Sequence, residues 1–149
     1  MLPATKAIPK ELLPIYDRPL IERVVKEAIE GGIREIILVT RSGKEAIKNH
    51  FDSNYELEHR LVKKGKDKIF EDIVKIIPDD VKISWIRQIY ALIYFLFLEG
   101  LNGFKTDADV YDCGNKLGFL SANLAIGMRD SKSREAIYAL FNKLINDDI

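Results

Sequence analysis

Two lysines near the start of the chain lie on a segment that contains three prolines. Lys6 and Lys10 stand among Pro3, Pro9 and Pro14. Proline fixes φ at about −65° and disfavours helix in the residue before it. The loop is therefore rigid and loses little conformational entropy when it holds its lysines in place for a ligand. Ammonium groups on a rigid loop suit phosphate, although most surface lysines are simply solvated. The segment therefore indicates either a phosphate-binding loop or an exposed basic loop.

A second polar segment stands far downstream, where an acidic residue lies beside a glycine-broken turn and another lysine follows. Its residues are Tyr111-Asp112-Cys113-Gly114-Asn115-Lys116-Leu117-Gly118-Phe119. Cys113 is the only cysteine of the chain, so it has no internal disulfide partner, which fits a reducing compartment. The alternative interpretation is that this thiol is a small buried residue without chemistry.

Two other groups of ligand-type side chains favour a structural interpretation. Pro78-Asp79-Asp80 looks like an acidic turn that could bind metal, but it comes directly before a predicted strand, as an ordinary turn does. His50 and His59 do not share a helical face at zinc-ligand spacing, and no cysteine is near either. We interpret His50 as part of a helix end, where an imidazole interacts favourably with the C-terminal dipole.

Composition indicates a globular chain of about one domain. It has 149 residues, of which 47% are hydrophobic. Basic and acidic residues number 23 each, so no net field favours nucleic acid or an anionic membrane, and we expect neither as a partner. The start of the sequence shows no charged and apolar leader with a small-residue cleavage site. We therefore expect a cytoplasmic protein.

The segments around these polar groups predict an α/β organisation. Asp17 is a candidate N-cap for a helix from about Pro19 to Glu30, which Gly31-Gly32 would end. The β-branched run Glu35 to Thr40 predicts a buried parallel strand. Further expected elements are helices over Ser42 or Gly43 to Phe51, Tyr55 to Lys64 and Asp67 to Ile77, a strand over Val81 to Ile86, and helices over Gly114 to Met128 and Ser133 to Ile145, with Asp130 to Ser133 as turn and cap.

The most apolar run, Ile89 to Leu98, ends at Glu99-Gly100 and follows Arg87 and Gln88. A membrane span needs about 20 apolar residues, so this run is too short to cross a bilayer. Because it is apolar on all sides of a helix, it predicts a buried or partner-binding helix. An exposed adhesive patch is the other interpretation.

The two polar segments, in their order along the chain, resemble one enzyme family. LPATKAIPKELLPI, followed by Asp17-Arg18-Pro19-Leu20-Ile21, and then DCGNKLGF look like bacterial UTP–glucose-1-phosphate uridylyltransferase, also called UDP-glucose pyrophosphorylase. The resemblance covers most of residues 1–88, including Gly31 to Thr40 and Asn49 to Asp52. It resumes at about Lys105 and continues through the last predicted helices.

The resemblance implies a truncated member of that family. In the family, a first strand and a Gly-x-Gly-Thr-Arg turn precede the opening loop, and a long central region follows the position of Arg87-Gln88; we expect both to be missing here. The expected fold is α/β, an incomplete Rossmann-like nucleotidyltransferase fold with a short, mostly parallel sheet and C-terminal helices. The expected single domain has a Rossmann-like part over residues 1–88, an apolar junction over 89–104 and a helical part over 105–149.

The resemblance also implies a reaction and a set of site residues. A glucose 1-phosphate oxygen would attack the α-phosphate of UTP, giving UDP-glucose and pyrophosphate, with Mg²⁺ and cationic side chains on the phosphate oxygens. Lys10 is the implied catalytic residue and, with Lys6, binds nucleotide phosphates, and Lys116 is a further phosphate contact. Asp112 matches the family's magnesium-binding aspartate before Cys-Gly-Asn-Lys, and hard oxygen ligands suit that ion.

Two functions remain open on the sequence alone. The first is an active uridylyltransferase, which predicts magnesium-dependent UTP binding. The second is a catalytically inactive deletion remnant that self-associates through Ile89 to Leu98. Separately, a missing first strand would leave an edge of Glu35 to Thr40 unpaired, which favours dimer formation or aggregation. The second function predicts oligomers without nucleotide affinity. In both cases we expect a homo-oligomer.

Overall fold

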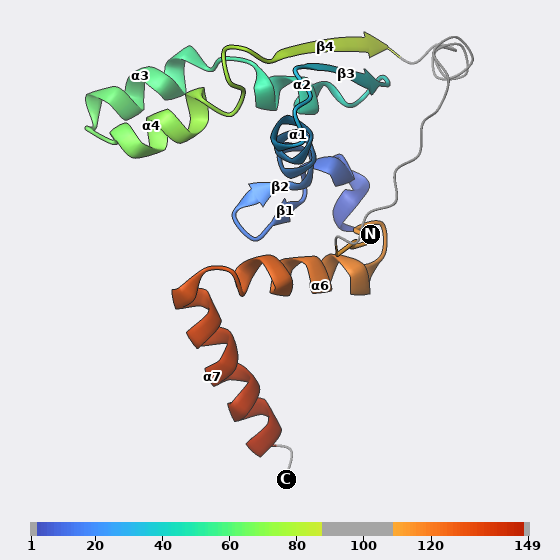
Figure 1. The fold of residues 1–149 in the computed structure, drawn as a ribbon, viewed down its shortest axis with the longest axis vertical. Helices are drawn as coiled ribbons and strands as arrows, with labels where there is room; N and C mark the ends of the chain where they lie inside the picture. The colour runs from blue at the N-terminus through green and yellow to red at the C-terminus, as the bar shows by residue number, and fades with distance from the viewer. Residues whose placement is uncertain (1–2, 88–108, 148–149) are drawn as a thin grey trace. The chain divides into compact units, whose positions relative to one another are not determined.

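The computed structural model describes residues 3–87 and 109–147, and the chain divides into two compact units (Figure 1). The terminal unit comprises Met1–Leu20 and Thr106–Ile149, and the sheet unit comprises Ile21–Lys105. The predicted run from Ile89 to Leu98 lies outside the described residues. The single-domain division predicted from the sequence stays a prediction.

The terminal unit begins with two short 3₁₀ turns, η1 (Ala4–Lys6) and η2 (Lys10–Leu12), and a small antiparallel hairpin. The hairpin strands are β1 (Pro14–Ile15) and β2 (Arg18–Pro19), so that Tyr16 and Asp17 form a two-residue turn. The predicted N-cap at Asp17 with Pro19 in the first helical turn is wrong. Pairing across the hairpin keeps Arg18 and Pro19 extended, as the restriction on a residue before proline favours, and the helix begins one residue later.

Two helices complete the terminal unit, α6 (Lys116–Gly127) and α7 (Ser131–Asp147), as predicted within a few residues. Asn115 caps α6, since its Oδ1 accepts a hydrogen bond from the Gly118 amide at 2.7 Å. Asp130 caps α7 in the same way, with Oδ2 accepting from the Ser133 amide at 2.8 Å, which confirms the predicted turn and cap. Strand β1 packs on α6, and Ile15 and Ala122 are 1% and 3% exposed.

The sheet unit contains most of the predicted elements in the predicted order (Figure 1). They are α1 (Leu20–Glu30), β3 (Glu35–Thr40), α2 (Glu45–Phe51), α3 (Tyr55–Lys63), α4 (Asp67–Val74) and β4 (Lys82–Arg87). Helix α1 ends at Gly31 and Gly32 as expected, because Gly32 has a φ of 92°, which glycine adopts without steric cost. The buried apolar side chains of this unit are Val25, Ile47, Leu61 and Val81.

Strands β3 and β4 pair in parallel, in register from Glu35 with Lys82 to Thr40 with Arg87. Helices α2, α3 and α4 connect them, which confirms the α/β class and the short parallel sheet. The prediction that β3 is buried on both faces is wrong. Ile37 and Val39 are 42% and 40% exposed, because among the described residues this sheet has two strands and covers one face of β3 more than the other.

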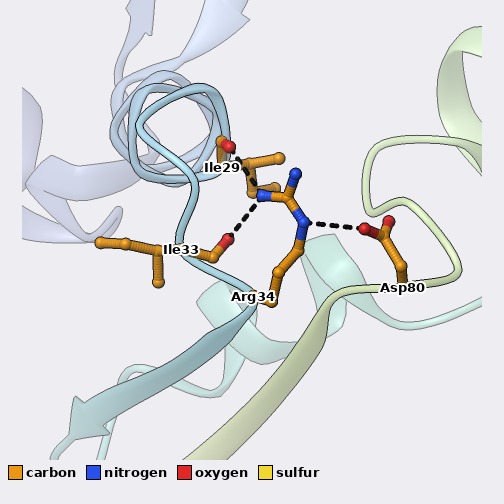
Figure 2. Close-up of polar contacts among 4 residues, drawn as sticks. All are labelled: Ile29, Ile33, Arg34 and Asp80. Atoms are coloured by element: carbon orange, nitrogen blue, oxygen red, sulfur yellow. Dashed lines mark hydrogen bonds and ion pairs between the residues drawn. The ribbon is translucent and has the colours of Figure 1, made fainter.

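Arg34 links the end of α1 to the turn before β4 (Figure 2). Its Nε donates to Asp80 Oδ2 at 2.7 Å, and its Nη1 donates to the carbonyl oxygens of Ile29 and Ile33 at 2.9 and 3.1 Å. The Arg34 carbonyl accepts from the Lys82 amide at 2.8 Å. The acidic turn therefore has the structural role that its position in the sequence indicated. Among the described helices, none has the length and apolarity to cross a membrane.

Candidate functional site

All four predicted site residues lie in the terminal unit. Lys6 ends η1 and Lys10 begins η2, both in the proline-rich opening segment. Asp112 lies in the turn before α6, and Lys116 is the first residue of that helix. The fold thus collects in one compact unit side chains from two ends of the sequence.

The opening segment is held by short-range backbone hydrogen bonds. The Lys6 amide donates to Pro3 O at 3.0 Å, which closes η1. The Leu12 amide donates to Pro9 O at 2.9 Å, which closes η2 around Lys10. Both lysine residues are exposed. The loop therefore presents two cationic side chains from closed turns, as its prolines indicated.

The Asp112 turn holds its carboxylate at both oxygens. Oδ1 accepts from the Gly114 amide at 2.8 Å, and Oδ2 accepts from Asn115 Nδ2 at 2.9 Å. Asn115 thus caps α6 with its oxygen and binds the carboxylate with its nitrogen. A Cβ atom at Gly118 would stand 2.1 Å from Asp112 O, so this close approach of turn and helix requires glycine.

Charge and hydrogen bonding keep Asp112 ionised. The Gly114 amide, the Asn115 side chain and, as a smaller contribution, the Lys10 ammonium lower the pKa of the Asp112 carboxyl. The Lys10 contribution is the smallest of these, and Lys10 belongs to the same compact unit as Asp112. Burial and the neighbouring Asp112 raise the pKa of the Cys113 thiol, so the cysteine is protonated at neutral pH and is a poor nucleophile.

Asp112 is suited to a hard cation such as Mg²⁺. Each carboxylate oxygen accepts one of these two hydrogen bonds and retains further lone-pair capacity. In the described ranges, no group of three or more His, Cys, Asp or Glu residues gathers in a way that could hold a metal ion. A single aspartate suits an ion that takes one protein carboxylate and completes its shell with phosphate oxygens and water, as Mg²⁺ can, and Asp112 as its ligand stays a prediction.

The two histidines have structural surroundings in the sheet unit. His50 lies in the last turn of α2, as predicted, and its Nε2 is 3.0 Å from Oε2 of the buried Glu22 on α1. The His59 ring stacks on Tyr55 at 6.0 Å between centroids. Neither arrangement is that of a metal ligand.

Sequence reasoning missed the residues that join the two halves of the terminal unit. The Tyr16 amide donates to Asn123 Oδ1 at 2.7 Å, and the Tyr16 hydroxyl lies 2.7 Å from Ser133 Oγ. These partners are 107 and 117 residues away along the chain. No local pattern in residue type marks such pairs.

Comparison with known proteins decides the family. The sequence profile described as "Nucleotidyl transferase" matches residues 1–89. The chain belongs to the nucleotidyl transferase family. The match confirms the resemblance carried by the opening segments. Because the match ends at residue 89, the resemblance of the DCGNKLGF segment, which contains Asp112 and Lys116, stays a prediction.

Similar proteins with established names cover part of this nucleotidyl transferase chain. The UTP–glucose-1-phosphate uridylyltransferase of Haemophilus ducreyi is 51% identical over 88 residues, which are 59% of this chain and 30% of the relative. The solved UDP-glucose pyrophosphorylase of Acinetobacter baumannii matches with a TM-score of 0.57 and 50% identity, over 59% of this chain and 31% of that one. A UTP-bound structure of the enzyme from that organism gives a TM-score of 0.57 and 49% identity over 58% and 30%. The chain thus spans about 30% of the length of these relatives.

Proposed function

We propose that the chain functions as a UTP–glucose-1-phosphate uridylyltransferase and carries part of that enzyme's phosphate and magnesium site. The observation that carries this proposal is that one compact unit brings together Lys10 and the ionised Asp112 carboxylate from opposite ends of the sequence. Relatives named for this activity match the opening segment, and one solved relative is described as UTP-bound. UTP and glucose 1-phosphate are the proposed substrates.

Each site residue has a role that its chemistry supports. A glucose 1-phosphate oxygen forms a new bond to the α-phosphorus of UTP, and the bond from that phosphorus to the bridging oxygen breaks. The electron pair leaves with pyrophosphate. Lys10, as the catalytic cation, stabilises the negative charge on the phosphate oxygens, and Lys6 and Lys116 add further positive charge. Bound Mg²⁺ would neutralise charge on the same oxygens, with Asp112 as its protein ligand.

We also propose a second function, self-association, on a separate observation. Helix α7 carries large apolar side chains that are 47–61% exposed, at the helical spacing of a stripe: Tyr138, Leu140, Phe141, Leu144 and Ile145. The formal net charge is zero, so two copies do not repel each other through net charge. A second copy of this chain is therefore the proposed occupant of the stripe. We further propose a cytoplasmic location, which the single cysteine supports.

Titration calorimetry of the full chain with UTP tests the enzyme proposal. We expect UTP to bind in the presence of Mg²⁺ and to bind more weakly after chelation. Lys10→Ala should weaken binding about tenfold, as expected for loss of a charge-assisted phosphate contact. Asp112→Asn should abolish the effect of Mg²⁺. Lys143→Ala, which removes an exposed lysine of α7, is the matched control and should leave binding unchanged.

Pyrophosphate release from UTP and glucose 1-phosphate, measured with the same proteins, separates binding from turnover. Release by the wild-type chain that is lost in Lys10→Ala and Asp112→Asn supports the proposed reaction. Equal UTP binding and equal background release in all four proteins would rule out the proposed site.

A further inference from the structure

Tyr16 occupies an unfavourable backbone conformation at the tip of the β1–β2 hairpin. Its φ is 63°, and among the described non-glycine residues it is the one with a positive φ. Two-residue hairpin turns need positive φ, which glycine and asparagine adopt easily. A bulky residue in this region is strained and persists where surrounding contacts compensate for the strain.

The compensating contacts come from both C-terminal helices. The Tyr16 amide donates to Asn123 Oδ1 on α6 at 2.7 Å, and Asn123 Nδ2 donates to Phe119 O at 2.9 Å. The second bond orients the Asn123 amide so that its oxygen faces Tyr16. The Tyr16 hydroxyl lies 2.7 Å from Ser133 Oγ on α7.

The tyrosine ring also packs against the buried Gly127 at the end of α6. A Cβ atom at that glycine would stand 3.6 Å from Tyr16 Cδ2, so the ring lies directly over the helix backbone. Tyr16 therefore contacts α6 along its second half and reaches the start of α7. We call the Tyr16–Asn123 and Tyr16–Ser133 hydrogen bonds, with this ring packing, the hairpin contact.

The hairpin contact lies between the two site segments. On one side, η2 carries Lys10 and leads directly into β1, where Ile15 is fully buried. On the other side, α6 begins directly after the Asp112 turn and is joined to it through Asn115. A rigid helix thus connects the partner of the hairpin tip to the carboxylate.

We infer that Tyr16 and Asn123 are positioning residues, which set the place of Lys10 relative to Asp112 by fixing the hairpin to α6. Their consequence for nucleotide binding rests on the proposed function. Their effect on the distance between Lys10 and Asp112 does not rest on the proposed function, because this distance can be tested with or without a ligand.

Cross-linking of the full chain tests the inference without nucleotide. Cys113 adjoins Asp112 and is the only cysteine, so a thiol- and amine-reactive reagent attached to it marks one place. Mass spectrometry then counts its products with Lys10 and with Lys116. Lys116 serves as the internal standard, because it lies in the same turn as Cys113 and does not depend on the hairpin. The ratio of Lys10 to Lys116 products reports the distance in question.

Four variants are compared with the wild-type chain. Asn123→Ala removes the acceptor for the Tyr16 amide, and Tyr16→Asn removes ring and hydroxyl while keeping a residue that tolerates positive φ. Each should lower the ratio about fivefold, as expected for loss of one hydrogen bond or its packing. Asn123→Asp keeps an acceptor oxygen and should restore most of the ratio. Tyr55→Phe, which changes an exposed tyrosine of α3, is the control and should change nothing.

The outcomes separate this inference from the proposed function. Lowered ratios in Asn123→Ala and Tyr16→Asn support the inference, even if the wild-type chain binds no UTP and the proposed function fails. If the wild-type chain does bind UTP, the same two variants should weaken that binding although neither residue touches the nucleotide. An unchanged ratio in both variants, or a wild-type chain that yields the Lys116 product but no Lys10 product, would overturn the inference.

Discussion

Two aspartates gain their lowered pKa values from hydrogen bonds at the starts of helices. The Gly114 amide and the Asn115 side chain lower the pKa of Asp112, and the Ser133 amide and hydroxyl lower that of Asp130. A folded pKa below the unfolded one means that the unfolded chain binds more protons, so stability rises with pH in that range. Stability from these groups is therefore fully present above the ordinary aspartate pKa of 3.8 and is lost as pH falls through the lower folded values.

Urea unfolding at several pH values measures this dependence. We expect the urea concentration at the unfolding midpoint to decrease as the pH is lowered below about 4. The decrease should be less steep in Asp112→Asn and Asp130→Asn than in the wild-type chain. Asp147→Asn, at the end of α7, provides a control with the same change in charge. The prediction is contradicted if the urea midpoint of the two test variants falls with decreasing pH as steeply as that of the wild-type chain.

Two glycines of α6, Gly118 and Gly127, should respond differently to substitution by alanine. A Cβ at Gly118 would overlap Asp112 O at 2.1 Å, so Gly118→Ala should displace the Asp112 turn and lower stability by about 1–3 kcal/mol. Gly127→Ala is the matched control, since its Cβ would meet Ile137 and Tyr16 at ordinary contact distances of 3.5 and 3.6 Å. It should be neutral or raise stability by up to about 1 kcal/mol through helix propensity. Urea midpoints of equal size in both variants would oppose this account.

Residue type alone could predict part of the candidate site. Lys10 and Asp112 stand out because lysine on a proline-rich loop and aspartate beside a glycine turn have direct chemical uses. Tyr16 and Asn123 do not stand out, because their roles arise from a contact across 107 residues. A tyrosine at positive φ is visible only in the folded backbone.

Among the elements, the α1 end and the turn before β4 depend on one side chain. Arg34 makes an ion pair with Asp80 and donates to two carbonyl oxygens, so Arg34→Ala should lower the stability of the sheet unit by about 1 kcal/mol. Arg34→Lys should recover little of this loss, because an ammonium lacks the guanidinium fork. Lys75→Ala breaks an exposed pair with Glu71 on α4 and serves as the control, with an effect of at most about 0.5 kcal/mol.

Hydrogen exchange locates that loss. Amides of β4 should exchange faster in Arg34→Ala than in Lys75→Ala, because Arg34 also joins β4 through its carbonyl and the Lys82 amide. Equal exchange rates of the β4 amides in the two variants would mean that the Arg34 side chain does not stabilise β4.

Local sequence patterns predicted most helices and both strands of the parallel sheet. Helical periodicity, glycine stops and β-branched runs act over a few residues, so α1, α3 and β3 end close to their predicted bounds. The β1–β2 hairpin was not predicted, because each strand has two residues and its stability depends on packing against α6. That packing also explains why α1 starts after Pro19 and not at it.

On the scale of the whole molecule, self-association is the prediction with the simplest measurement. We expect sedimentation velocity to show concentration-dependent oligomers. Phe141→Asp and Leu144→Asp should weaken association about tenfold or more by placing a charge in the exposed α7 stripe. Val62→Asp, at a valine of α3 that is 55% exposed, adds the same charge elsewhere and should leave association unchanged. A wild-type chain that sediments as a monomer at all concentrations would end this proposal.

The family could be predicted from the sequence, but the grouping of the chain into units could not. Segments such as LPATKAIPKELLPI combine residue types that can be compared with a family directly along the chain, and the family match over residues 1–89 confirms that resemblance. The terminal unit instead depends on which distant segments pack together. Neither composition nor periodicity contains that information.

The discontinuity of the terminal unit also orders events during synthesis. Tyr16 is translated 107 residues before Asn123 and 117 residues before Ser133, so closing this contact requires a loop of more than a hundred residues. A nascent chain therefore presents Lys10 to solvent long before Asp112 exists. The site is assembled only after translation has passed Asp112, and a chain that stops before this residue contains the lysine loop without its carboxylate.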